Sequence, residues 1–317
     1  MYSYSFIIPH KDIPSLLKRC LESIPNRPDI EIIVIDDNSN EESQKELKKI
    51  SRPGLQIIYT TENKGAGFAR NVGVANAHGK WILFADADDF FLPNLFESLD
   101  KYSDYKQPLI LFKSYCRDSN NLETTGSRQW ICDMFSKNMN DFKENKISNI
   151  TLLLGFGVPW GKMVRKSFLE EKDISFEEVR YSNDIGWITQ LAIGTNCNDI
   201  VVSNDFLYCL TDRADSLYQI RNKEAFFCRF EVRHRQHLLL LKNGIPSDFN
   251  FCPFVDDARS FGLAFLLKFY KKILNPNCHI PAIYQIEKFF HLKTPYFYLV
   301  VQIIKTLFYK QKSKSTY

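Results

Sequence analysis

The first third of the chain alternates short apolar runs with polar or amphipathic segments. The runs are rich in Ile, Val and Phe, which predicts β-strands within residues 4–9, 30–39, 55–61 and 81–86. The segments between them have helical spacing of apolar residues or a polar, helix-compatible character, which predicts helices within residues 13–24, 40–51 and 62–79. Strands that alternate with helices in this way predict an α/β fold with a mostly parallel sheet.

Polar or glycine-containing segments follow all four predicted strands. In a parallel sheet the carboxyl ends of the strands meet at one edge, and ligands bind in the crevice outside that edge. The sequence therefore predicts one shared crevice, lined by Pro9–Asp12, Asp36–Asp37, Asn63–Gly67 and Asp86–Asp89.

The rest of the chain follows a different pattern. Residues 108–115 predict a further strand, and residues 158–171 predict a loop that enters a helix. After about residue 216 the sequence changes to long amphipathic helices. We therefore expect an α/β domain over residues 1–215 and an α-helical C-terminal region over residues 216–317.

The composition is typical of a soluble globular protein, because 44% of the 317 residues are apolar and 25% are charged. The formal net charge of +4 is too small to indicate a nucleic-acid partner, so none is expected. The eight cysteines form no CxxC pair and no zinc-finger spacing, which favours reduced thiols in the cytoplasm. No stretch fits a signal peptide or a membrane span. We expect a cytoplasmic protein, at most peripheral on the inner face of a membrane.

Three carboxylates follow the fourth predicted strand, in the sequence DADD at residues 86–89. Adjacent anions repel each other unless water, backbone donors or a cation offsets the charge. Asp86 and Asp88 could present oxygens to a divalent cation that bridges the phosphates of a nucleotide. A helix N-cap at Asp89 explains the same residues, and the DxD pattern alone does not decide between the two.

Four further residues carry candidate chemistry, each with a structural alternative. Asp37 could accept a hydrogen bond from a base or ribose, or it could close an Asx turn. Arg70, which follows two glycines, could bind phosphate or lie on the surface. Asp184 lies among apolar residues, where a raised pKa would suit a general base, but the spacing alone favours a helix N-cap. Trp160 could stack on a sugar or pack in the core.

Taken in chain order, these pieces resemble the family 2 glycosyltransferases, a large inverting group with the GT-A fold, and in particular those that build bacterial surface polysaccharides. The matching segments are SFIIPHKD, EIIVIDDNS, ENKGAGFARNVGVANAHGKWILFADADD, VPWGKMVRKSFLE and YSNDIGW. Each fragment is a weak signal, but their order and spacing agree over roughly residues 1–190. The resemblance implies a Rossmann-like, mostly parallel sheet flanked by helices, and it favours the functional interpretation at most of these positions.

The resemblance also implies roles for individual residues. The residues that it places against the nucleotide-sugar are Pro9, Lys11, Asp37, Asn63, Arg70, Asp86 and Ala87. It implies that Asp86 faces the ribose or the metal and that Asp88 coordinates Mg²⁺ or Mn²⁺ bridging the diphosphate. Asp184 aligns with the catalytic base of the family. Trp160 and Asn183 fall near the place where acceptors bind.

Two positions depart from the family pattern. The family often has an aromatic residue where this chain has Lys11, so we expect the stem of Lys11 to lie over the base instead. The usual Glu before the catalytic base is Asn183 here, which leaves Asp184 without a like-charged neighbour.

The implied reaction is a single in-line displacement that inverts the anomeric carbon. Asp184 takes the proton of the attacking hydroxyl, and the cation held by Asp88 and Asp86 stabilises the leaving nucleoside diphosphate. The expected donor is a UDP-sugar, and the expected acceptor is a glycan or a lipid-linked saccharide. The alternatives are a non-catalytic scaffold of a membrane glycan assembly and a nucleotidyltransferase, although PHKDIPS lacks the glycine-rich loop of the latter.

The resemblance does not cover the C-terminal third of the chain. Residues 294–314 are aromatic and basic, which is typical of a segment that lies on a membrane surface. A helical cap that packs on the catalytic domain or on a second subunit explains the pattern equally well. A membrane contact and a homodimer both stay open as alternatives.

Overall fold

The computed structural model describes residues 2–213, 216, 219–247 and 252–273. Contacts divide the chain into two compact units, Met1–Ser247 and Asp248–Tyr317. All strands of the described residues belong to the first unit, which also contains the long helix α9 (Lys223–Lys242).

The sequence predicts the domain boundary near residue 215, where the pattern changes from alternating strands and helices to helices alone. The described residues after 219 are indeed mainly helical. The extents of the two domains, 1–215 and 216–317, nevertheless stay a prediction.

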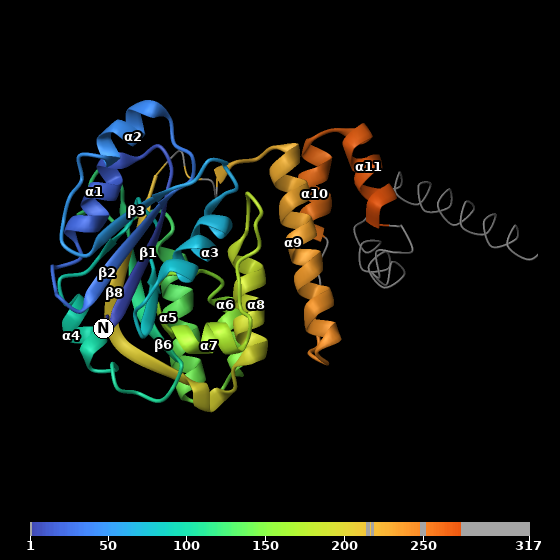
Figure 1. Cartoon of the computed structure of the whole chain (residues 1–317). Helices are drawn as coiled ribbons and strands as arrows, with labels where there is room; N and C mark the ends of the chain where they lie inside the picture. Colours follow the sequence, from blue (N-terminus) through green and yellow to red (C-terminus); the bar gives the residue numbers. More distant parts are fainter. Residues whose placement is uncertain (1, 214–215, 217–218, 248–251, 274–317) are drawn as a thin grey trace, which may run out of the picture. The chain divides into compact units, whose positions relative to one another are not determined.

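The first four strands are confirmed as parallel neighbours: β1 (Tyr4–His10), β2 (Ile30–Asp36), β3 (Leu55–Tyr59) and β4 (Trp81–Phe84). β1 and β2 are nearly continuous apolar runs because both of their faces are covered. Figure 1 shows α1 (Pro14–Glu22) and α2 (Glu41–Leu47) on one side of these strands and α3 (Ala66–Asn76) on the other. Right-handed crossovers produce this arrangement, because the chain moves from β1 outward to β3 and then returns to β4.

Four further strands extend the sheet to eight, in the order β3-β2-β1-β4-β7-β6-β8-β5. They are β5 (Phe90–Phe91), β6 (Leu109–Asp118), β7 (Lys162–Arg165) and β8 (Ile200–Asp212). β7 is antiparallel to both β4 and β6, and β5 is antiparallel to β8, whereas β6 and β8 are parallel to each other. The predicted mostly parallel sheet is therefore confirmed, and the carboxyl ends of β1 to β4, β6 and β8 reach the same edge.

Residues 158–171 differ from the prediction of a loop that enters a helix. The strand β7 lies inside this segment, directly before α7 (Lys166–Glu171). A four-residue strand between two neighbours of the sheet leaves no recognisable period in the sequence, so pairing with β4 and β6 decides its conformation.

The other named helices among the described residues of the first unit are α4 (Leu95–Asp100), α5 (Gln129–Lys143), α6 (Asn149–Gly155), α8 (Asp184–Gly194) and the short 3₁₀ helix Cys197–Asp199. α8 is apolar on nearly all sides and is anchored through Trp187, which is fully buried. The Trp187 ring stacks on Phe176 at 4.9 Å and meets the edge of Phe84 at 5.6 Å. These contacts fix the start of α8 beside the end of β4.

The described part of the second unit consists of α10 (Cys252–Ser260) and α11 (Leu263–Ile273). Within the described residues, no helix is both long enough and apolar enough to cross a membrane. Residues 294–314, for which the sequence suggests a membrane or subunit contact, lie outside the described residues.

Candidate active site

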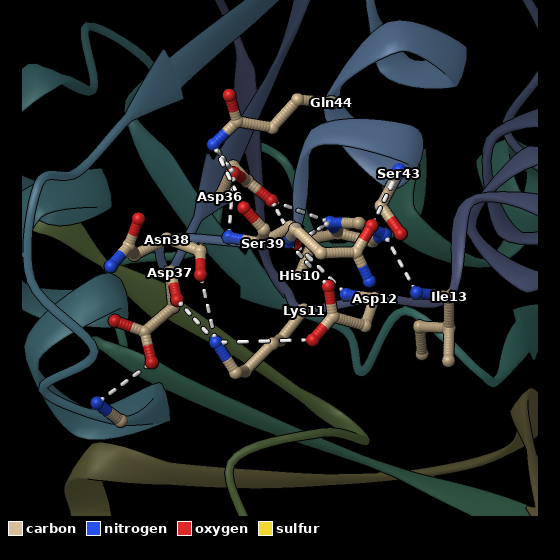
Figure 2. Close-up of polar contacts among 12 residues, drawn as sticks. His10, Lys11, Asp12, Ile13, Asp36, Asp37, Asn38, Ser39, Ser43 and Gln44 are labelled. Carbon is tan, nitrogen blue, oxygen red and sulfur yellow. Dashed lines mark hydrogen bonds and ion pairs between the residues drawn. The ribbon is translucent and has the colours of Figure 1, made fainter.

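A buried hydrogen-bond network joins the ends of β1 and β2 (Figure 2). His10 Nδ1 lies 2.9 Å from Asp36 Oδ1, and the Ile13 amide donates to His10 Nε2 at 3.2 Å, so the proton of a neutral imidazole lies on Nδ1. Ser39 donates to both Asp36 oxygens, from its hydroxyl at 2.5 Å and from its amide at 3.1 Å. Burial raises the pKa of Asp36, but the hydrogen bonds from His10 and Ser39 outweigh it and lower the pKa below its ordinary value.

Lys11 reaches from the end of β1 to the turn after β2. Its Nζ donates to the carbonyl oxygens of Asp37 and Asn38, at 3.0 and 2.9 Å (Figure 2). The aliphatic stem therefore spans the two strand ends at the edge where a nucleotide is expected. This position agrees with the predicted role of Lys11 against a base, which stays a prediction.

The Asp37 carboxylate organises the glycine segment. Its two oxygens accept hydrogen bonds from the amides of Lys64, at 3.0 Å, and Gly65, at 2.8 Å. Gly65 has a φ of +91°, which a side chain would strain, and it directly precedes α3. Asn63 is exposed in the same segment, and Pro9 is half-buried in β1. Direct contacts of Pro9, Asp37 and Asn63 with a nucleotide stay predictions.

Arg70 connects three of the segments that the sequence analysis singled out. Its guanidinium is buried in α3 and donates to Asp86 Oδ1 at 2.6 Å and to Asn183 Oδ1 at 2.8 Å. The same group lies 5.3 Å from the centre of the Phe176 ring. The glycine helix, the acidic segment after β4 and the start of α8 therefore meet at one side chain.

Asp86 and Asp88 remain partly open to solvent, with side-chain exposures of 33% and 20%, whereas Ala87 between them is buried. Burial raises the pKa of Asp88, and the neighbouring Asp86 charge raises it further. Arg213 opposes these effects with its Nε 2.9 Å from Asp88 Oδ2. The acidic segment therefore carries more negative charge than its surroundings neutralise.

Asp89 has a structural role. Its buried carboxylate accepts hydrogen bonds from the Thr211 amide at 2.6 Å and from the Tyr208 hydroxyl at 2.8 Å. The Tyr208 hydroxyl in turn accepts the Asp86 amide at 2.9 Å. The interpretation of Asp89 as an N-cap is wrong, because the next helix begins only at Leu95. Asp89 instead ties the acidic segment to β8.

Asp184 is the first residue of α8 and is half-buried. Burial raises its pKa, and the Arg70 guanidinium acts in the opposite direction. Among the described residues, no side chain forms a hydrogen bond or ion pair with the Asp184 carboxylate, so its oxygens are available to a ligand. Asn183, predicted near the acceptor, accepts a hydrogen bond from the Arg70 guanidinium at its side-chain Oδ1. The roles of Asp184 as base and of Asn183 as an acceptor contact stay predictions.

Trp160 lies in the core. Only 3% of its surface is exposed, and its ring stacks on Tyr208 with a centroid distance of 5.4 Å and an interplanar angle of 11°. The Phe156 ring packs against it edge-on. The predicted contact of Trp160 with an acceptor gains no support from this position.

Two cations near the site escaped the sequence analysis. Lys162 is buried in β7, where its Nζ donates to the carbonyl oxygens of Phe156 at 2.9 Å and Val158 at 2.5 Å. Burial lowers the pKa of Lys162 well below its ordinary value, and the Asp184 carboxylate opposes the shift. The position of Lys162 within the apolar segment PWGKMV was a sequence signal for a buried lysine. No such sequence signal marks Arg213, because its position beside the acidic segment depends on β8.

The acidic segment fits Mg²⁺ or Mn²⁺ if substrate phosphates complete the ligand set. Asp86 and Asp88 offer the hard carboxylate oxygens that these cations prefer, and one or two carboxylates plus phosphates are usual for Mg²⁺. The described residues contain no group of three or more His, Cys, Asp or Glu placed to hold a metal by themselves. Burial is the main cause of the raised pKa of Asp88, and a cation bound beside it would oppose this effect.

A family model described as glycosyl transferase family 2 matches residues 5–172. The chain belongs to this family. The matched region contains β1 to β7, Arg70 and the acidic segment, and it ends before Asn183 and Asp184. The two residues at the start of α8 therefore lie outside the match.

Curated relatives extend the family likeness over more of the chain. Glycosyltransferase GlyA of Streptococcus pneumoniae is 24% identical over 250 residues, which are 76% of this chain and 35% of that protein. An uncharacterized glycosyltransferase of Bacillus subtilis, EpsJ, is 22% identical over 225 residues, 70% of this chain and 64% of that protein. The chain thus spans about a third of GlyA and somewhat less than two thirds of EpsJ.

Among solved structures, residues 1–349 of S. aureus TarS in complex with UDP-GlcNAc have a TM-score of 0.58 with this family 2 chain. The identity is 18%, and the alignment covers 82% of this chain and 71% of that one. At this identity the likeness concerns the fold, and it confirms the predicted GT-A architecture.

Proposed function

We propose that this chain is a metal-dependent, inverting glycosyltransferase that moves a sugar from a UDP-sugar to a saccharide or lipid-linked glycan acceptor in surface-polysaccharide synthesis. Membership of family 2 supports glycosyl transfer. The solved complexes of S. aureus TarS with UDP and with UDP-GlcNAc support a uridine nucleotide as the donor, because the fold is shared.

One observation carries the proposal: Arg70 bonds both Asp86 and Asn183, so the acidic segment and the neighbour of Asp184 meet at one side chain. A donor that contacts Asp86 and Asp88 would then lie within reach of an acceptor beside Asp184. A structural acid at the start of a helix would usually serve as a cap or an ion-pair partner. Asp184 has no such side-chain partner among the described residues, which favours a chemical role.

The proposed chemistry assigns one proton transfer to the protein. The acceptor hydroxyl loses its proton to Asp184 while its oxygen forms the new bond to the anomeric carbon. The bond from that carbon to the diphosphate breaks on the opposite side, which inverts the configuration. A raised pKa suits Asp184 for this role, because a base whose pKa approaches the working pH accepts a proton readily.

Asp88 and Asp86 would hold Mg²⁺ or Mn²⁺, which supplies charge neutralisation for the leaving diphosphate. Arg213 and Arg70 already bind these two carboxylates. When the site is loaded, both guanidinium groups lie where they can also bind phosphate oxygens. The proposed donor site therefore combines hard oxygen ligands with arginine donors.

The first test is a thermal-shift panel of nucleoside diphosphates and sugar nucleotides, with and without Mn²⁺. Ligands that bind the folded state raise the melting temperature according to their occupancy. We expect a Mn²⁺-dependent shift with UDP and with one UDP-sugar, and its loss in Asp88→Asn. Glu97→Gln is the matched control, because it removes one carboxylate whose side chain is 77% exposed on α4.

The outcomes separate the proposal from its rivals. A shift with UDP that needs Mn²⁺ and Asp88, together with release of UDP from the sugar nucleotide, supports the transferase. A nucleotidyltransferase would instead respond to nucleoside triphosphates and release pyrophosphate. No shift with any nucleotide in the panel would overturn the proposed donor and favour a non-catalytic scaffold.

We further propose that the C-terminal region contacts an anionic membrane surface. Leu263 and Leu267 are exposed one turn apart on α11, and Lys271 and Lys272 lie in its last turn. This pattern suits an interfacial helix. Flotation with vesicles that contain anionic lipid should retain the protein, and Leu263→Glu with Leu267→Glu should release it. Self-association without vesicle binding in sedimentation would favour the homodimer instead.

A further inference from the structure

The helices α8 and α9 run side by side in a common register. Cys228 Sγ donates to the Tyr181 carbonyl oxygen at 3.4 Å, and Gln236 Nε2 donates to Thr189 Oγ1 at 2.9 Å. Both pairs are separated by 47 residues in the sequence, so the two segments advance together. Positions of α9 between Cys228 and Gln236 therefore lie beside the start of α8, where Asp184 is found.

Arg233 lies in this part of α9, and its guanidinium is held by uncharged side chains. Its Nη1 donates to Gln236 Oε1 at 2.9 Å, and Gln236 in turn holds Thr189 of α8. Glutamine orients the guanidinium without neutralising it. Desolvation of the guanidinium by the surrounding protein lowers the pKa of Arg233, and the Asp184 carboxylate opposes this shift. The guanidinium and the candidate base are therefore close enough to influence each other.

Two acids near this part of α9 are already paired with other arginines. Glu177 binds Arg235 at 2.5 Å, and Glu224 lies 4.0 Å from Arg180. No acidic side chain forms an ion pair with Arg233 among the described residues. Its remaining N–H donors can form the paired hydrogen bonds that a guanidinium offers to a carboxylate or a phosphate.

A second feature makes the surroundings of Asp184 less negative. Asn183 stands where family 2 enzymes usually have Glu, so Arg70 meets one carboxylate, Asp86, and one neutral amide. The neighbourhood of Asp184 thus lacks one negative charge and contains an arginine with no acidic side chain of its own.

We propose that the acceptor carries an anionic group, a carboxylate or a phosphate, beside the hydroxyl that reacts, and that Arg233 binds this group. The inference rests on the proposed function and specifies the class of its acceptor. Arg233 would fix the orientation of the acceptor, and the reacting hydroxyl would then lie beside Asp184. The two sources of anionic oxygens differ in geometry and charge, so matched glycosides can distinguish them.

The test measures binding of three small glycosides to the full chain with UDP and Mn²⁺, by saturation-transfer NMR titration. The probes are methyl glucoside, methyl glucuronide and methyl glucoside 6-phosphate, which share one ring and differ in charge. We expect at least one charged glycoside to bind about tenfold or more tightly than the neutral one. Arg233→Gln should remove this difference, and Arg233→Lys should retain part of it.

Arg235→Gln is the matched control, because it removes the same charge from an exposed position two residues away on α9. The melting-temperature shift with UDP is recorded for every variant. If that shift is absent in the parent protein, the proposed function fails. If the shift is present but no charged glycoside binds more tightly than methyl glucoside, the inference about the acceptor is overturned and the proposed function stands.

The rival role for Arg233 is to keep Asp184 ionised. In that case Arg233→Gln moves the pH profile of UDP release and leaves the relative affinities of charged and neutral glycosides unchanged. This result would also overturn the inference. A loss of discrimination with an unchanged pH profile supports it.

Discussion

The Arg70 guanidinium lies 2.6 Å from Asp86 Oδ1, and this ion pair joins a buried side chain of α3 to the partly exposed acidic segment. The side chain of Arg70 is 6% exposed, whereas that of Asp86 is 33% exposed. One partner is therefore fixed by the fold, and the other can face a ligand. The pair positions Asp86 and also places a positive charge where a diphosphate is proposed.

Replacing Arg70 with Met should weaken both the fold and nucleotide binding. The change removes the bonds to Asp86 and Asn183 and leaves a partly buried carboxylate without its counter-charge, so we expect a loss of about 1–3 kcal/mol in the free energy of unfolding. The melting-temperature shift with UDP should also fall. Lys137→Met, which breaks an exposed pair on α5, should cost about 0.5 kcal/mol or less. Equal losses in the two variants during urea denaturation would contradict the assignment.

Asp184 should determine the acid limb of the pH profile. Its raised pKa means that the carboxylate is protonated at a higher pH than an ordinary Asp, and a protonated base cannot accept the hydroxyl proton. Transfer should therefore fall as the pH drops through that raised pKa and stay high above it. Asp184→Asn should lower kcat by about 10²- to 10⁴-fold with little change in UDP affinity. An unchanged kcat in this variant would remove Asp184 from the role of base.

Gly67 should tolerate no side chain. A Cβ at this position would lie 2.1 Å from the Glu177 carbonyl oxygen and 2.9 Å from Asn183 Cβ, so Gly67→Ala must push residues 177–183 away from α3. We expect a loss of about 1–3 kcal/mol in stability and a weaker response to UDP. Gly194→Ala is the control, because its nearest neighbour would be 3.6 Å away and alanine favours a helix. Parallel stability measurements on both variants check this prediction.

Lys162 should give the protein a measurable dependence of stability on pH. Its pKa is lowered in the folded state, so the unfolded chain binds more protons between that value and about 10.4. The free energy of unfolding should therefore rise with pH across this window from the Lys162 contribution. Lys162→Met should remove that contribution and leave two carbonyl oxygens unpaired, which costs about 1–3 kcal/mol for each. Identical slopes in parent and variant would show that Lys162 does not titrate there.

The first half of the sheet could be predicted from the sequence because β1, β2 and β4 are buried on both faces. β1 and β2 appear as nearly continuous apolar runs, and the strand ends bring His10, Asp36 and Asp86 to one edge. β7 and β8 could not be predicted in the same way. β7 has four residues, and β8 carries polar residues that are explained only by pairing with β6 and β5.

The sequence predicted which residues belong to the candidate site better than it predicted which side chains they contact. Sequence spacing relates Arg70 to Asp86, but the bond from Arg70 to Asn183 joins positions 113 residues apart. Trp160 lies in a segment expected to be a loop, yet the stacking of Tyr208 from a strand that was not predicted explains its burial. The partners of Asp37 could not be predicted either, because the amides of Lys64 and Gly65 approach its carboxylate only in the folded glycine segment.

The hydrogen bonds between the acidic segment and β8 determine when this segment can fold during protein synthesis. Thr211 binds Asp89 through its amide and the Asp88 carbonyl oxygen through its hydroxyl, across separations of 122 and 123 residues. When β4 and the acidic segment have just left the ribosome, the nascent chain does not yet contain Thr211, which holds that segment in the folded protein. Such long-range contacts form late, because the intervening loop must close first. The acidic segment reaches its final geometry only after translation has passed residue 211.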